Sequence, residues 1–276
     1  CNDVFIGDGM PNGMAGEGGD DIFVGSSGAG DRYDGASGFD WATFKDDGFG
    51  VNIDLNVRAF DLAPIPASAA AILARFDSVE GLSGSAHSDI LRGDDEDALA
   101  IATSGAQGST LTNIGLVAGL QELLDTMLGG SVESFNAGNI ILGGAGSDII
   151  EGRGGNDLID GDKWLNVRIS VRENNDGSGV EIDSYDNAAD LVSKMVTGEI
   201  NPGQLVIVRE IKDGVGPDYD TATFRGLQAD YTVLVDDQGT ADFGDDVITV
   251  TDNVAGRDGV DTLMNIERLR FSDGFQ

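Results

Sequence analysis

Basic residues, cysteine and long apolar runs are scarce in this chain of 276 residues. Lysine and arginine together number 16 against 49 aspartates and glutamates, which gives a formal net charge of −33. A chain this acidic repels phosphate groups, so nucleic acids and anionic membranes are poor partners. No apolar run is long enough to span a bilayer, and no secretory signal peptide is recognisable. The single cysteine, Cys1, cannot form an internal disulfide, so an extracellular fold would need another cross-link.

Residues for catalysis are equally few. His87 is the only histidine, so the histidine pairs of zinc and haem enzymes are excluded. The sequence contains neither a G-x-S-x-G nucleophile motif nor a G-x-x-x-x-G-K-[ST] phosphate loop. His87 as a haem ligand and a carboxylate pair as in glycosidases stay open. The simpler interpretations are that His87 is an exposed turn residue and that the carboxylates are metal ligands. We therefore expect no enzymatic activity from this chain.

Glycine is abundant instead, and it follows a nine-residue period. Residues 143–160 read G-G-A-G-S-D-I-I-E-G-R-G-G-N-D-L-I-D, which is two copies of the pattern G-G-x-G-x-D-x-U-x, where U is a large apolar residue. Glycine allows turns with positive φ, and the aspartate and the turn carbonyls supply the hard oxygen ligands that Ca²⁺ prefers. The last three residues of each copy predict a short strand with Ile150 or Ile159 facing inward. A flexible linker would not place isoleucine at this period.

The same period continues into three arrays, at residues 1–44, 80–100 and 134–169. Neighbouring nonapeptides face opposite sides of such a fold, so turns 18 residues apart stack. This predicts Asn139 on Asp157 and Asp148 on Asn166. One inserted residue interrupts the first array near residues 26–30. The candidate calcium ligands are Asp3, Asn12, Asp21, Asp31, Asp40, Asp89, Asn139, Asp148, Asp157 and Asn166.

The acidic run at residues 94–97 has two interpretations. It adds ligands to the second array, or it is a solvated acidic loop, which is the more ordinary role of a charge run.

A longer internal repeat accompanies the arrays. Residues 40–45 read D-W-A-T-F-K and residues 220–225 read D-T-A-T-F-R. Each copy is followed by an alternating strand pattern and later by U-x-x-U-E-x-L, at residues 76–82 and 263–269.

Helical segments are few. An alanine-rich pattern predicts a helix over residues 66–76, and a leucine-rich pattern predicts one over residues 111–130. A third helix is predicted over residues 186–198, with Asp186 as its N-cap and Gly198 at its C-terminal end. The leucine stripe of the second helix indicates core packing, with a partner-binding groove as the alternative. The aspartate-glycine pair at residues 176–177 and the segment D-D-Q-G at residues 236–239 predict hairpin turns between strands.

The nonapeptides resemble the repeats of the haemolysin-type calcium-binding (RTX) family. Residues 159–172 and 200–211 resemble the region downstream of an animal-type haem peroxidase domain in large secreted bacterial proteins. The RTX resemblance implies export by type I secretion, folding on extracellular calcium, and one cation between each stacked pair of turns.

We therefore expect a mainly β fold. It comprises a parallel β-roll or β-helix of calcium-binding nonapeptide turns with short helices, and an additional antiparallel β-module. The arrays with their helical insertions would occupy residues 1–170, and a β-rich module with one helix would occupy residues 171–276 and continue into further repeats of a parent protein.

The expected function is that of a Ca²⁺-binding structural module of a secreted, extracellular bacterial protein, which supports secretion and adhesion. Its expected partners are calcium ions, adjacent domains, and a cell-surface or matrix ligand. The alternative is an accessory region of a haem peroxidase whose catalytic domain lies upstream.

Overall fold

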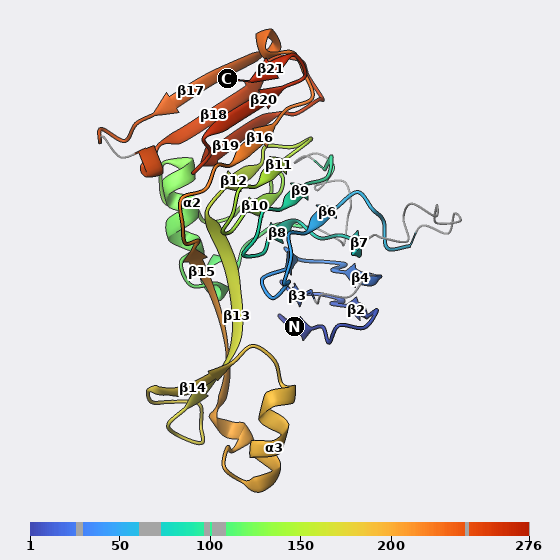
Figure 1. Ribbon diagram of the computed structural model, residues 1–276, viewed down its shortest axis with the longest axis vertical. Helices are drawn as coiled ribbons and strands as arrows, with labels where there is room; N and C mark the ends of the chain where they lie inside the picture. Colours follow the sequence, from blue (N-terminus) through green and yellow to red (C-terminus); the bar gives the residue numbers. More distant parts are fainter. Residues whose placement is uncertain (26–29, 61–72, 97–99, 101–108, 241–242, 276) are drawn as a thin grey trace.

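The chain folds into a stack of short strands from which a narrow arm projects (Figure 1). The computed structural model describes residues 1–25, 30–60, 73–96, 100, 109–240 and 243–275. Strands account for 38% of the structure and helices for 12%, so the protein is mainly β, with both parallel and antiparallel sheets. The expectation of a mainly β fold is therefore confirmed.

The largest sheet has nine strands, of which the first seven run parallel. Its order is β1 (Val4–Ile6), β3 (Ile22–Val24), β5 (Trp41–Thr43), β8 (Gly81–Ser83), β10 (Ile140–Leu142), β12 (Leu158–Asp160), β19 (Val260–Met264), β18 (Val247–Asp252) and β17 (Tyr231–Asp236). The last two strands add an antiparallel hairpin, and the connection between them begins at the predicted D-D-Q-G segment.

Two smaller sheets contain the strands that alternate in sequence with these parallel strands. The six-stranded sheet has the order β21 (Gly274–Phe275), β20 (Arg268–Phe271), β16 (Thr221–Thr223), β11 (Ile149–Glu151), β9 (Ile90–Arg92) and β6 (Asn52–Asp54). The three-stranded sheet has the order β2 (Gly13–Ala15), β4 (Asp31–Asp34) and β7 (Ala74–Asp77). The chain thus passes from one side of the stack to the other with almost every turn.

The strand register follows the predicted repeat. Ile141 pairs with Ile159, so strands 18 residues apart lie side by side. Ile22 pairs with Trp41, which is one residue further apart and agrees with the inserted residue expected in the first array.

The main core lies between the opposing sheets. It contains Leu82 and Ile141 from the nine-stranded sheet, and Leu91 and Ile150 from the six-stranded sheet, all fully buried. Each is the central residue of a three-residue strand. The nine-residue spacing of apolar residues therefore arises because one side chain per turn points inward.

Helix α2 (Leu120–Leu128) packs its leucines into a second core on the other face of the nine-stranded sheet. Leu120, Leu123 and Leu124 are almost completely buried, so the predicted core role of the stripe is confirmed. The helix is shorter than the predicted span of 111–130. The 3₁₀ turn Ile114–Leu116 precedes it, and Gly119, with φ of 85°, separates the two.

The helix expected over residues 66–76 is not supported. Residues 66–72 lie outside the described residues, and Ala74–Asp77 form strand β7. Tyr33 pairs with Phe76, which is buried, so strand pairing and core packing set the conformation of residues 74–77.

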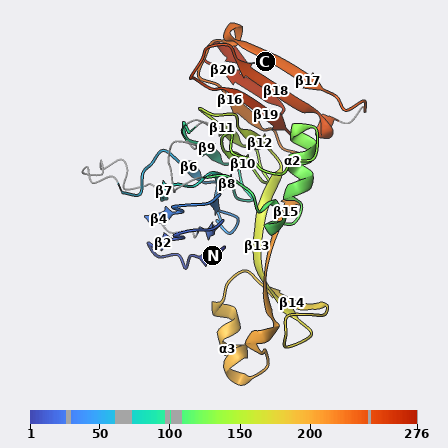
Figure 2. The ribbon, with the colours of Figure 1, turned by 180° about the vertical axis from the view of Figure 1, so that it is seen from behind.

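The arm comprises β13 (Lys163–Arg172), β14 (Glu181–Tyr185), α3 (Ala189–Thr197) and β15 (Leu205–Asp213) (Figures 1 and 2). Strand β13 pairs antiparallel with both β14 and β15, and the β13–β14 hairpin turns at the predicted aspartate-glycine pair, where Gly177 has φ of 78°. Helix α3 begins after Ala188 rather than Asp186, and it ends at Gly198 as expected.

The second half of the chain extends the sheets of the first half. Strand β16 pairs with β11, and β19 pairs with β12. The predicted boundary between residues 170 and 171 lies inside β13.

Short 3₁₀ turns occupy Pro202–Gln204, Gln228–Asp230 and Phe243–Asp245. Within the described part of the chain, no helix is long and apolar enough to cross a bilayer.

Candidate metal site

Acidic side chains form a ladder along the turns that lead into the nine-stranded sheet. At most steps a residue at or just before the start of a strand donates its backbone N–H to a side-chain oxygen of the equivalent residue in the next layer. Between Glu80 and Asn139 the bond runs instead from Asn139 Nδ2 to Glu80 O, at 3.2 Å. Asp21 N donates to Asp40 Oδ1 at 2.8 Å, and Asn139 N donates to Asp157 Oδ1 at 2.7 Å. This first ladder contains Asp3, Asp21, Asp40, Glu80, Asn139, Asp157 and Asp261.

A second ladder runs along the turns that lead into the six-stranded sheet. Asp89 N donates to Asp148 Oδ1, and Asp148 N donates to Asp220 Oδ1, both at 2.7 Å. Asp220 N in turn donates to Glu267 Oε2 at 2.6 Å. Each carboxylate therefore accepts a backbone hydrogen bond from the neighbouring layer, which fixes its position between two turns.

One predicted stacking pair is correct in position and the other is wrong. Asn139 lies on Asp157 as expected. Asp148 lies on Asp220 instead of Asn166. The chain leaves the turn after Asp162 and continues as strand β13, where Asn166 donates Nδ2 to Glu210 Oε1 at 3.0 Å.

Several ladder carboxylates have one buried oxygen with no hydrogen-bond partner among the described residues. This holds for the Oδ2 atoms of Asp21, Asp40, Asp148, Asp157 and Asp220, and each of these residues is 0% exposed. A buried, unpartnered carboxylate oxygen is costly, since nothing replaces the water it has lost. These atoms therefore require either a proton or a cation.

Carbonyl oxygens converge on the same places. A Cβ atom added to Gly143 would lie 2.3 Å from Gly161 O and 2.6 Å from Asp148 Oδ2. At Gly35 it would lie 2.1 Å from Ser78 O and 2.4 Å from Asp40 Oδ2. The glycine is needed because its empty side faces a cluster of hard oxygens. Such a donor set fits Ca²⁺, which takes carboxylate and carbonyl ligands.

The electrostatics agree with this interpretation. Burial, opposed by the backbone hydrogen bonds and reinforced by neighbouring carboxylates, raises the pKa of Asp40 to about 8 and that of Asp148 to about 9. Burial likewise raises the pKa of Asp157 and of Asp261 well above the ordinary value. Full ionisation near neutral pH therefore needs a positive charge in the turns.

The other predicted ligands have different surroundings. Asp31 Oδ2 accepts a hydrogen bond from the Tyr33 hydroxyl at 2.9 Å. Both oxygens of Asp89 accept hydrogen bonds from Ser85, at 2.6 and 2.9 Å. Asp3 is exposed and Asn12 is half-buried. Asp31 and Asp89 thus have less need of a cation than the carboxylates with an unpartnered oxygen.

The ladders also contain four acidic residues that the nine-residue spacing did not predict as ligands: Glu80, Asp220, Asp261 and Glu267. The internal repeat carried the signal for three of them. It aligns Asp40 with Asp220, and the two U-x-x-U-E-x-L segments align Glu80 with Glu267. In both copies the glutamate accepts the backbone N–H of the aligned aspartate.

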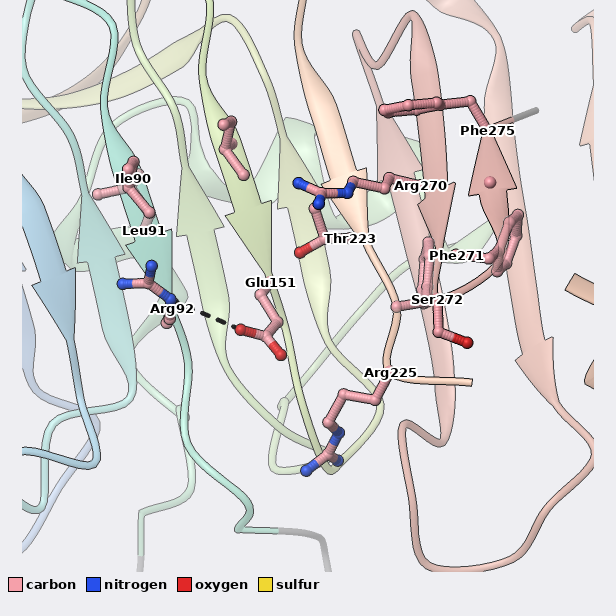
Figure 3. A pocket seen from close by; sticks show the side chains of 13 residues that line it. Ile90, Leu91, Arg92, Glu151, Thr223, Arg225, Arg270, Phe271, Ser272 and Phe275 are labelled. Atoms are coloured by element: carbon pink, nitrogen blue, oxygen red, sulfur yellow. Dashed lines mark ion pairs between the residues drawn. The ribbon is translucent and has the colours of Figure 1, made fainter. Parts of the chain in front are cut away.

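A separate groove lies on the outer face of the six-stranded sheet (Figure 3). Two of its arginines already have acidic partners. Arg92 lies 3.7 Å from Glu151, and Arg225 lies 2.5 Å from Asp258. Arg270 lies over the ring of Phe275, 5.8 Å from its centroid. The charges of two of these three arginines are therefore compensated by carboxylates.

His87 is exposed in its turn, where its backbone N–H donates to Ser85 Oγ. The surroundings of this side chain are those expected for an ordinary turn residue.

Comparison with known proteins adds no family assignment. A scan against protein-family models and a search of curated proteins both found no match.

Proposed function

We propose that this chain is a calcium-binding structural module whose glycine turns form a parallel β-roll with Ca²⁺ held between the layers. The observation that supports the proposal most strongly is the set of buried, unpartnered carboxylate oxygens at Asp21, Asp40, Asp148 and Asp157. Each faces a glycine turn, and an oxygen-binding cation would satisfy it.

The donor set favours Ca²⁺ over Mg²⁺. Calcium accepts six to eight oxygens in flexible geometry, whereas Mg²⁺ needs a near-ideal octahedron and keeps several waters. The turns offer carboxylates and main-chain carbonyls from two layers, held in place by backbone hydrogen bonds. When bound, the ion supplies charge neutralisation and cross-linking between layers.

Calcium binding would also contribute directly to folding. The net charge of −33 opposes compaction, and each Ca²⁺ cancels two negative charges. Because the ligand set exists only in the folded chain, binding free energy becomes folding free energy.

We extend the proposal to location. Extracellular calcium modules typically bind with a Kd of about 10⁻⁴–10⁻³ M. With that affinity the roll would stay open at cytosolic calcium levels and would close after secretion, which suits a structural or adhesive role outside the cell. No feature of the described residues favours the haem-peroxidase alternative.

Isothermal titration calorimetry on the chelator-treated protein tests the proposal. We expect several Ca²⁺ ions per chain in the affinity range given above, with much weaker binding of Mg²⁺. Absence of calcium binding at 10 mM, roughly ten times the weaker limit of that range, would refute the calcium-binding role.

A further inference from the structure

Two turns of the structure are copies of one another. In the first, the Asp40 Oδ2 atom and the Ser78 carbonyl lie over Gly35. In the second, the Asp220 Oδ2 atom and the Asn265 carbonyl lie over Gly161, at 2.4 and 2.0 Å from the position of an added Cβ. Ser78 and Asn265 have nearly equal positive φ angles, 51° and 52°.

The second copy is interrupted by the arm. In the first copy, residues 35–40 run from glycine to aspartate without interruption. In the second copy, Gly161 and Asp162 are followed by the arm, and the turn resumes with Asp218, Tyr219 and Asp220. Gly161 N still bonds Met264 O, as Gly35 N bonds Asp77 O, so the turn keeps its place in the stack. The arm is therefore an insertion within a single turn.

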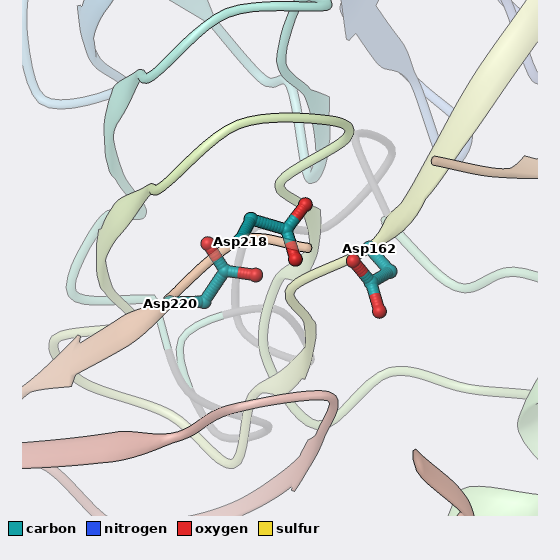
Figure 4. Close-up of side chains that lie close together, drawn as sticks. All are labelled: Asp162, Asp218 and Asp220. Atoms are coloured by element: carbon teal, nitrogen blue, oxygen red, sulfur yellow. The ribbon is translucent and has the colours of Figure 1, made fainter. Parts of the chain in front are cut away.

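The interrupted copy has two carboxylates that the first copy lacks. The positions of Ala36 and Gly38 in the first copy correspond to Asp162 and Asp218 in the second. Asp162, Asp218 and Asp220 each offer an oxygen, and these oxygens lie within 4.8 Å of one another (Figure 4). Three carboxylates have replaced one at the place where the arm leaves and rejoins the stack.

The cluster also contains a buried oxygen that needs a partner. Asp220 is 0% exposed, and its Oδ2 atom has no hydrogen-bond partner among the described residues. The Asn265 carbonyl converges with this atom over Gly161. Three close carboxylates with a buried, unpartnered oxygen repel one another strongly unless a cation lies between them.

We propose that Asp162, Asp218 and Asp220 bind one Ca²⁺ ion that closes the interrupted turn and fixes the base of the arm. The inference rests on the proposed calcium-binding function and adds a site outside the nonapeptide pattern. The ion would connect the residue before β13 to the segment after β15. It would thereby reinforce the bond from Gly214 N to Asp162 O, which at 2.7 Å already joins the two ends.

The test compares the full chain with its Asp162→Asn/Asp218→Asn variant. Calorimetric calcium titration is combined with hydrogen exchange of peptides covering residues 161–166 and 212–218. We expect one site of the variant to bind roughly tenfold more weakly or not at all, because ligand charge tunes calcium affinity. Calcium should slow exchange at the arm base in the wild-type chain and have little effect there in the variant.

Two further variants guard the result. Asp236→Asn/Asp237→Asn makes the same charge change at two exposed positions, the last residue of β17 and the first residue after it, and should leave the binding stoichiometry unchanged. Asp162→Ala/Asp218→Gly installs the residues found at the equivalent positions of the uninterrupted turn, so it should fold and should lose the same site.

The outcomes are distinct. Unchanged stoichiometry, affinity and arm-base protection in both site variants would overturn the proposed ion and leave the ladder sites standing. Absence of calcium binding by the wild-type chain would overturn this site and the proposed function together.

Discussion

Single carboxylates differ in what their second oxygen does. Asp148 and Asp157 have an Oδ2 atom that is buried and unpartnered, whereas the Oδ2 atom of Asp31 accepts a hydrogen bond from Tyr33. The nine-residue spacing treats these aspartates as equals. Their hydrogen bonds separate carboxylates that leave one oxygen unpartnered among the described residues from those whose oxygens are satisfied within the protein.

This difference predicts unequal effects of two matched substitutions. Asp148→Asn should weaken calcium binding at its turn by roughly tenfold or more, because it removes a charged ligand. Asp31→Asn should change calcium affinity little. Calorimetric titration of the two variants checks the prediction, and equal losses of affinity would contradict it.

The glycine that faces each carboxylate predicts a second result. Gly143→Ala would press its methyl group against Gly161 O and Asp148 Oδ2, and the neighbouring backbone has little room to move. We expect a destabilisation of about 1–3 kcal/mol, the usual cost of overpacking.

Gly48→Ala is the matched control for this substitution. Gly48 is exposed, has no heavy atom within 4 Å of an added Cβ, and does not need a positive φ. Urea unfolding in calcium should therefore show a normal midpoint for the control and a lower one for Gly143→Ala. Equal midpoints would mean that the oxygens over Gly143 can move aside to accommodate a methyl group.

At the scale of elements, the sequence predicts the short strands of the repeats but not the pairing of strands that lie far apart in the chain. The short strands follow from one apolar residue per nonapeptide, and Ile150 and Ile159 are buried as predicted. Asn166 was misplaced because the nine-residue count continues through Asp162, where the chain departs as β13. The local sequence does not predict that β13 pairs with β15, some forty residues later, or that Asp220 accepts the backbone N–H of Asp148 in the second ladder.

The arm has a small core, against which Ile6 of β1 also packs, and this core gives a prediction at this scale. Leu191 of α3 is fully buried with Ile169, Val171 and Ile200. Leu191→Ala should destabilise the arm by about 2–5 kcal/mol, as is typical of a buried leucine. Calcium binding in the ladders, which lie in the stack, should be retained.

Hydrogen exchange across residues 181–205 measures the effect. Exchange should accelerate in Leu191→Ala and stay normal in Val192→Ala, since Val192 is 53% exposed. Loss of calcium binding in Leu191→Ala would show that the arm and the stack fold as one unit.

For the whole molecule, the buried carboxylates predict an unusual pH dependence without calcium. Burial raises the pKa of Asp40, Asp148 and Asp220 to about 8, 9 and 7, from an unfolded value of 3.8. Between about pH 4 and pH 9 the folded chain therefore holds more protons than the unfolded chain. The free energy of unfolding should fall as pH rises through this window.

Urea unfolding in chelator at pH 5 and pH 8.5 checks this sign. We expect the calcium-free chain to be more stable at pH 5, and saturating calcium to reduce or reverse the difference, because calcium binds the ionised carboxylates. Greater stability of the calcium-free chain at pH 8.5 would show that these aspartates are ionised without a cation.

The most direct test of the calcium-dependent fold is thermal unfolding followed by circular dichroism. The chain is measured in chelator, in millimolar Ca²⁺ and in equal Mg²⁺. A ligand that binds only the folded state stabilises it by about 2.7 kcal/mol per site at a hundredfold excess over Kd. We predict greater strand signal and a higher Tm in calcium, with Tm rising further at each increase in concentration and with little effect of Mg²⁺. Identical spectra and an identical Tm in chelator and in calcium would contradict the account.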